Sequence, residues 1–130
     1  LVILSNVDNA SFAGSNARLG VTFDAILTAQ DIGSYKPDLN NFHVLLQHAR
    51  TTGITPEQHL HVAQSLYHDH VPAQAVGLKT VWINRYGLKR ATAGTSTATA
   101  AAGATPAAAP VTPHWEFPTL RAFADALLAS

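Results

Sequence analysis

Apolar runs alternate along this chain with amphipathic segments. The sequence opens in the run Leu1-Val2-Ile3-Leu4, which is typical of a strand buried on both faces. Three later stretches, 23–28, 60–64 and 80–83, have a similar character and predict three more strands. Because helical stretches separate the strands, the pattern predicts an α/β fold, with a Rossmann-like parallel sheet and flanking helices.

The helical stretches carry start and stop signals. Residues 9–19 predict a helix that ends at Gly20. A second helix is expected to begin at Pro37, where the missing N–H costs nothing, and to end near Gly53. The rest of the predicted order is a helical turn at 55–58, a loop through Asp69, a helix at 72–76, and a final helix with one apolar face formed by Leu120, Phe123, Ala124, Leu127 and Leu128.

Residues 91–113 differ sharply from the rest of the chain. They comprise 10 Ala, 6 Thr, 3 Pro, 2 Gly, one Ser and one Val, without a charged residue. A segment without large apolar side chains cannot offset the entropy of ordering, so we expect a disordered surface insertion. A rigid alanine-rich helix is the alternative, which the dispersed Thr, Gly and Pro residues oppose.

The length and the first residues bear on domain organisation. A chain of 130 residues fits one domain with a single core. The sequence contains no Met and begins directly inside a predicted buried strand, whereas domains usually begin with a surface lead-in. We therefore expect this chain to be part of a longer protein.

Charge and cysteine content narrow the function classes. Eight Lys and Arg balance eight Asp and Glu, so the chain lacks the basic excess that binds nucleic acid or an anionic membrane. The absence of Cys excludes disulfides, thiolate zinc sites and cysteine nucleophiles. No apolar run approaches the ~20 residues of a membrane span. We expect a cytoplasmic protein.

Polar clusters follow three of the predicted strands. Ser5 and Asn6 follow the first strand, residues 34–37 the second, and residues 65–69 the third. Ligands of parallel α/β sheets bind beyond the carboxyl ends of the strands. One face is therefore expected to gather a hydroxyl, an amide, an ammonium and a carboxylate.

Lys36 is the most informative of these residues, because a cation directly ahead of a helix is disfavoured by about 0.3–1 kcal/mol. An anion between its ammonium and the helix would explain the position, and a solvated surface lysine is the alternative. Ser5 and Asn6 are candidates for binding an anionic substrate, or alternatively for capping and loop roles. Asp69 is a candidate for orienting Lys36 or holding a metal, or for capping the next helix.

Four histidines, His59, His61, His68 and His70, raise the question of a metal site. His59 and His61 would share a face of a strand only if both lie within it. No recognised ligand spacing such as His-Glu-x-x-His is present, so the sequence does not favour a histidine metal site.

Together and in this order, the clusters resemble motifs of the haloacid dehalogenase (HAD) superfamily of hydrolases. Leu4-Ser5-Asn6 resembles its second motif, and Tyr35-Lys36-Pro37-Asp38 its third. Residues 62–69, with 75–78, resemble the fourth motif. The following strand, Trp82-Ile83-Asn84-Arg85, is especially similar to the type II 2-haloacid dehalogenase branch.

The resemblance implies a HAD-like core and a covalent mechanism. An aspartate at the end of the first strand attacks carbon in dehalogenases, or phosphorus in phosphatases, and water hydrolyses the ester. In that scheme Ser5, Asn6 and Ser65 bind the substrate or stabilise charge. Lys36 and Asp69 are the catalytic candidates: Lys36 neutralises carboxylates, and Asp69 positions Lys36 or the water.

The chain departs from the family pattern in three respects. The motif with the nucleophilic aspartate and the cap segment are absent, which predicts a C-terminal part of a HAD-like core, incomplete at its N-terminus. In the family fold, the strand with the nucleophile lies between strands that this chain contains. Phe42 stands six residues after Lys36, where dehalogenases of this branch tend to have a tyrosine.

Position 65 separates two activities within the superfamily. The phosphatases usually carry a second acidic residue four positions before the aspartate, which helps hold magnesium, whereas this chain has Ser65. We therefore predict hydrolysis of a small anionic 2-haloacid without a cofactor or metal. A magnesium-dependent phosphatase is the alternative, and a non-catalytic remnant or binding protein is the second. The chain alone is expected to be inactive, and a homo-oligomer is left open.

Overall fold

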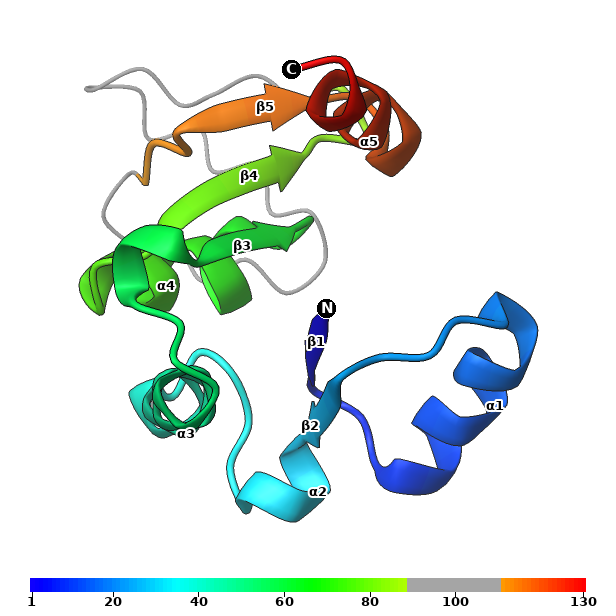
Figure 1. The fold of residues 1–130 in the computed structure, drawn as a ribbon, viewed down its shortest axis with the longest axis vertical. Coiled ribbons are helices and arrows are strands. Elements are labelled where there is room, and N and C mark those ends of the chain that lie inside the picture. The colour runs from blue at the N-terminus through cyan, green and yellow to red at the C-terminus, as the bar shows by residue number, and fades with distance from the viewer. Residues whose placement is uncertain (89–110) are drawn as a thin grey trace. The chain divides into compact units, whose positions relative to one another are not determined.

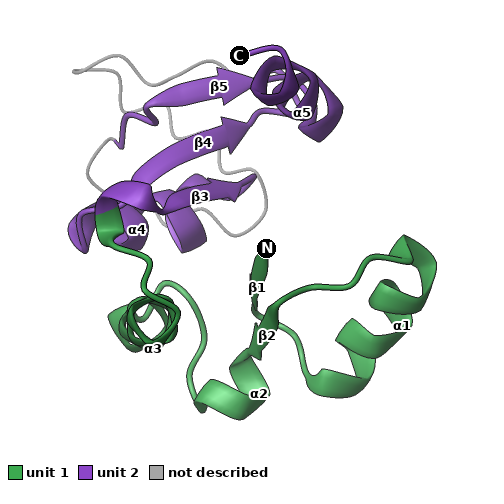
Figure 2. Cartoon of the chain, viewed as in Figure 1, with its two compact units in different colours: residues 1–56 green, residues 57–130 purple. Residues whose placement is uncertain are grey.

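The computed structural model describes residues 1–88 and 111–130. The chain forms two compact units, Leu1–Pro56 and Glu57–Ser130, and each is described by itself (Figure 2). Most of the predicted insertion at 91–113 lies outside the described residues. Its last three residues are described and lead, without regular structure, toward the final strand.

Unit 1 contains a two-stranded parallel sheet (Figure 1). Strand β1 spans Val2–Ser5 and β2 spans Ala25–Thr28. Three aliphatic or small apolar residues open each strand, and a hydroxyl residue ends it. The register pairs Ser5 with Thr28, so the polar segments that follow both strands begin at the same edge of the sheet.

The helices of unit 1 begin at capping side chains. Helix α1 (Asn9–Leu19) has Asp8 as its N-cap and ends at Gly20, which adopts the left-handed conformation (φ 62°). Helix α2 (Ala29–Ile32) was not predicted, and the Thr28 side chain caps it. Helix α3 (Leu39–Thr51) begins two residues after the predicted start at Pro37. The Asp38 side chain accepts the Asn40 N–H and so fixes where the helix begins.

Unit 2 contains a three-stranded parallel sheet in the order β3-β4-β5 (Figure 1). The strands are β3 (Leu60–Ala63), β4 (Lys79–Ile83) and β5 (Trp115–Phe117). Strand β5 was not predicted, because a strand of three residues, flanked by Pro113 and Pro118, gives too short a pattern. Its pairing with β4, from Val81–Trp115 to Ile83–Phe117, stabilises it.

The segment after β3 is helical, so the prediction of a loop through Asp69 is wrong. A short turn, η1 (Pro56–Gln58), precedes β3 as predicted. A π-helical segment, η2 (Leu66–His70), begins at Ser65 and continues directly into α4 (Val71–Ala75). Within η2, the backbone N–H groups of Asp69 and His70 both donate to the Ser65 carbonyl.

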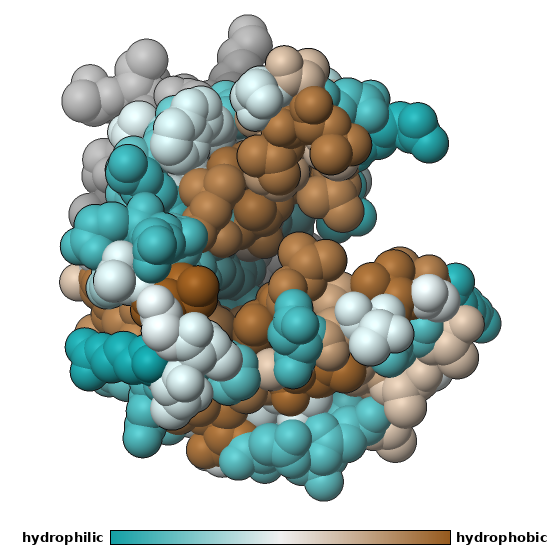
Figure 3. Space-filling view, viewed as in Figure 1, coloured by the Kyte–Doolittle hydropathy of each residue, from teal (hydrophilic) through white to brown (hydrophobic). Residues whose placement is uncertain are grey.

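Helix α5 (Leu120–Leu128) is the final helix that the sequence predicts, and Thr119 is its N-cap. Phe123 packs edge-to-face on Phe117 of β5, with ring centroids 5.5 Å apart. Figure 3 shows hydrophobic side chains at the molecular surface. In α5, leucines of the predicted apolar face remain exposed, namely Leu120, Leu127 and Leu128.

All strand pairs are parallel, and helices connect β1 to β2 and β3 to β4, which confirms the predicted α/β fold class. Among the described residues, no helix is long and apolar enough to cross a membrane.

His70 is a fully buried histidine at the end of η2. Its Nε2 lies 3.0 Å from the Ala63 carbonyl oxygen. Within the described part of the chain, its Nδ1 is buried without a hydrogen-bond partner. Burial lowers the pKa of His70, and the charge of His61 adds to this, while the Ala63 carbonyl and Asp69 oppose it.

Replacing His70 by Gln keeps an N–H for the Ala63 carbonyl but removes the titrating ring. The unfolded chain protonates this histidine at its ordinary pKa of 6.5, whereas the folded chain requires a lower pH. The stability that this difference in pKa contributes to the folded chain is complete above pH 6.5 and is lost as the pH falls toward the lower pKa of the folded state. We expect His70→Gln to lose unfolding free energy less steeply than the unmodified chain as the pH falls below about 6.5. Urea unfolding followed by tryptophan fluorescence measures this, and equal slopes would contradict it.

Candidate functional site

Ser5 and Asn6 stand at the carboxyl end of β1. Ser5 is the last residue of the strand, and Asn6 begins the polar segment that leads to α1. Both side chains are partly buried. This is the sheet edge at which parallel α/β proteins bind ligands, as the sequence predicts.

The Asn6 side chain bonds to the backbone of Lys36 in both directions. The Lys36 N–H donates to Asn6 Oδ1 at 2.7 Å, and Asn6 Nδ2 donates to the Lys36 carbonyl oxygen at 2.9 Å. The side-chain amide of Asn6 thus satisfies both the N–H and the carbonyl of Lys36, as the backbone of a neighbouring strand does in a sheet. The sequence predicts that Asn6 binds substrate, and the structure shows that it holds Lys36.

The Lys36 ammonium lies at the end of β1, where Nζ donates to the Leu4 carbonyl oxygen at 3.0 Å. Lys36 belongs to a turn in which the Asp38 N–H donates to the Tyr35 carbonyl oxygen, with a cis Lys36–Pro37 peptide bond. It precedes the first residue of α3 by three positions, and Asp38 caps that helix. The prediction that Lys36 stands directly at a helix N-terminus is therefore wrong. Its ammonium is held by β1 instead.

A second asparagine, Asn41, fixes the start of the same loop, and the sequence pattern does not predict this role. Asn41 is fully buried in α3. Its Nδ2 donates to the Ser34 carbonyl oxygen at 2.8 Å, and its Oδ1 accepts from the Ser34 hydroxyl at 2.7 Å. The sequence signal for a buried Asn41 is its position next to Phe42, within the apolar stripe of the predicted helix. Phe42 itself is fully buried.

Ser65 and Asp69 lie in the helical turn that follows β3 in unit 2. Ser65 is the N-cap of η2, and Asp69 is near the end of η2. The Ser65 hydroxyl caps η2 by accepting the His68 N–H at 3.1 Å, and it lies 3.0 Å from His68 Nδ1. Asp69 is buried, and its Oδ1 lies 3.1 Å from Nε2 of His61 on β3. The alternative that Asp69 caps the next helix is wrong, because His70 occupies the N-cap position of α4 without a side-chain hydrogen bond.

His59 is only partly buried. Burial lowers the pKa of His59, and the charge of His61 contributes to the shift. His59 precedes β3, whereas His61 lies within the strand. The described residues contain no group of three or more His, Cys, Asp or Glu side chains arranged to hold a metal ion.

The five predicted site residues therefore form two groups. In unit 1, Asn6 and Lys36 are bonded to one another beside Ser5. In unit 2, Ser65 and Asp69 share one turn, and Asp69 N–H donates to the Ser65 carbonyl oxygen at 3.2 Å. The first group supplies a cation, a hydroxyl and an amide, and the second a hydroxyl and a carboxylate.

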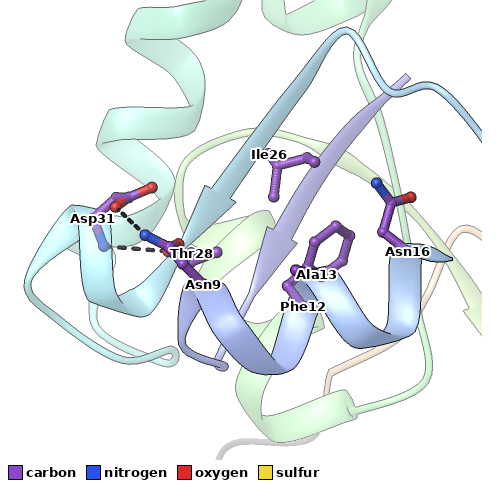
Figure 4. A pocket seen from close by; sticks show the side chains of 7 residues that line it. All are labelled: Asn9, Phe12, Ala13, Asn16, Ile26, Thr28 and Asp31. Carbon is purple, nitrogen blue, oxygen red and sulfur yellow. Dashed lines mark hydrogen bonds between the residues drawn. The ribbon is translucent and has the colours of Figure 1, made fainter.

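A separate pocket lies in unit 1 against α1 (Figure 4). It has a volume of about 270 Å³, and its lining includes Phe12 and Ile26. Thr28 Oγ1 donates to Asn9 Oδ1 at 2.6 Å, and Asn9 Nδ2 donates to Asp31 Oδ1 at 2.8 Å. These polar groups bond to each other, and none of the predicted site residues lines this pocket.

Similar solved structures identify the fold. A magnesium-bound Bacillus subtilis protein, YfnB, assigned to the HAD hydrolases, is 21% identical, with a TM-score of 0.73 over 98% of this chain and 48% of its own. A HAD phosphatase from Thermococcus onnurineus is 22% identical, with a TM-score of 0.70 over 98% of this chain and 49% of its own. An L-2-haloacid dehalogenase is 26% identical, with a TM-score of 0.67 over 100% of this chain and 50% of its own.

The chain therefore has the HAD-like hydrolase fold, which confirms the resemblance at the level of the fold. It spans about half the length of these solved structures. No family model matches the sequence, and no curated protein matches it.

Replacing Asn6 by Ala should release the Lys36 turn. Each lost hydrogen bond contributes about 1 kcal/mol, so the Lys36 amide is expected to exchange with solvent several-fold faster. Hydrogen exchange followed by NMR measures this. Asn40→Ala is the matched control, because Asn40 is an exposed amide bonded to the Ser34 hydroxyl of the same loop. Equal acceleration in both variants would contradict the specific role of Asn6.

Proposed function

We propose that this chain is the C-terminal part of a HAD-like hydrolase that acts on a small 2-haloacid. The nucleophilic aspartate belongs to a segment outside this sequence. Its carboxylate displaces halide from carbon 2 and forms an ester, and water then cleaves the ester to a 2-hydroxy acid and restores the carboxylate. The observation that carries this proposal is the placement of the Lys36 ammonium at the end of β1, with its backbone held by Asn6.

Each candidate residue receives a role that suits its chemistry. The Lys36 ammonium neutralises the carboxylates of nucleophile and substrate, and Ser5 offers a hydroxyl at the same strand end. Asn6 contributes by holding Lys36 and by its predicted contact with substrate. In unit 2, Asp69 positions the attacking water, and Ser65 binds substrate or shapes the turn that carries Asp69.

The residues present favour a dehalogenase over the alternative magnesium-dependent phosphatase. A hard cation requires several oxygen ligands, preferably carboxylates. At position 65 the chain offers a hydroxyl that already caps η2. The carboxylate of Asp69 lies against His61. This donor set fits magnesium poorly, and the phosphatase therefore remains the second candidate, supported by the likeness to a solved HAD phosphatase.

The extent of the chain supports a partial core. Residues 1–130 match about half of each solved chain. We propose that the preceding segment supplies a further strand. The site then takes a small anionic substrate.

The expected activity separates three hypotheses. The longer protein that contains this chain should release halide from 2-chloropropionate, with or without EDTA. The 130-residue chain alone should release none, because the proposed nucleophile is absent. Halide release and p-nitrophenyl phosphate cleavage are the two measurements. Turnover of phosphate alone, and only with magnesium, would favour the phosphatase. Inactivity on both would favour a non-catalytic protein.

Lys36→Ala in the longer protein tests the residue on which the proposal rests. Loss of a preorganised charge should reduce kcat by about 10²–10³-fold. The melting temperature should change little, because the lost hydrogen bond contributes only about 1 kcal/mol. Lys79→Ala is the matched control, since Lys79 is exposed at the start of β4. Equal kcat values for Lys36→Ala and the unmodified protein would contradict the assigned role.

A further inference from the structure

His61 and Asp69 form a buried pair of titratable side chains in unit 2. The His61 side chain is 10% exposed and that of Asp69 is 9% exposed. His61 Nε2 lies 3.1 Å from Asp69 Oδ1, within hydrogen-bonding distance. The two residues come from different elements, since His61 lies on β3 and Asp69 on η2.

We infer that His61 is a positioning residue, which holds the Asp69 carboxylate in its working orientation at the end of β3. This inference rests on the proposed function, because it assigns His61 a role through Asp69. His61 does not touch the substrate in this scheme.

The local backbone supports a fixed orientation of Asp69. The Ser65 hydroxyl caps η2, and the Ser65 carbonyl accepts the N–H groups of Asp69 and His70. With the backbone held, the side-chain torsions of Asp69 are the main variables that determine where its carboxylate lies. The contact with His61 restricts these torsions, so the turn and the strand together define where the carboxylate lies.

The composition of β3 argues against a purely structural role for the pair. The other residues of the strand are Leu60, Val62 and Ala63, and an apolar residue at position 61 would extend the same pattern. A buried polar pair is often no more stabilising than apolar side chains of similar volume. The pair instead provides a directional bond to a carboxylate that follows a parallel strand, where ligands bind.

The test compares His61→Leu with His61→Gln in the longer protein. Gln presents a side-chain N–H near the place of Nε2, whereas Leu presents none. We expect His61→Leu to reduce kcat by about a hundredfold, as a displaced catalytic group does, with little change in KM. His61→Gln should recover most of that loss. His43→Leu, an exposed histidine on α3, is the matched control and should retain full activity.

Several outcomes overturn the inference. A normal kcat in His61→Leu would do so. Equal loss of kcat in both His61 variants, with equal loss of melting temperature, would show a structural role and also overturn it.

A second measurement separates this inference from the proposed function. If the unmodified longer protein releases no halide, the proposed dehalogenase function is wrong. The ¹³C chemical shift of the Asp69 carboxyl then decides whether His61 holds it. A shift that moves in His61→Leu and returns in His61→Gln supports the positioning role, and an unchanged shift overturns it.

Discussion

The two hydrogen bonds between the Asn6 side chain and the Lys36 backbone determine the geometry of the candidate site in unit 1. They join the end of β1 to the turn before α3, across 30 residues of sequence. Ordering one residue of a free loop costs roughly 1–2 kcal/mol, so a turn with no anchor would sample many positions. Because Asn6 occupies both backbone groups of Lys36, only the side-chain torsions remain to place the ammonium, and the Leu4 carbonyl restricts those.

Unit 2 uses the same physical principle with different residues. The backbone of its turn is anchored by Ser65, and the carboxylate of Asp69 lies against His61. In both units, a charged candidate side chain is held in place by a polar residue from a preceding strand or strand end. The polar partners are therefore as important for the geometry as the residues that would meet a substrate.

The sequence predicts the elements that have strong local signals. Apolar runs identify four of the strands, and Gly20 marks the end of α1 correctly. Strand β5 depends on pairing with β4, and η2 depends on the Ser65 cap and on bonds to one carbonyl, so neither leaves a clear periodic pattern. The polar clusters at strand ends follow from topology. The roles of Asn41 and His61 do not, because their hydrogen bonds join one element to a neighbouring loop or element and leave no periodic pattern.

The charges within the two groups limit what this chain can do by itself. Ser5, Asn6 and Lys36 provide donors and a cation, which suit an anion but cannot attack it. Asp8 lies close in sequence, but it caps α1, and its hydrogen bonds with the Ser11 N–H and hydroxyl lower its pKa. Asp69 is only 6% exposed and lies against His61, so its carboxylate is poorly placed to reach a substrate carbon. The chemistry of these side chains therefore suits an acid as ligand, and the halide displacement that we propose requires a further carboxylate.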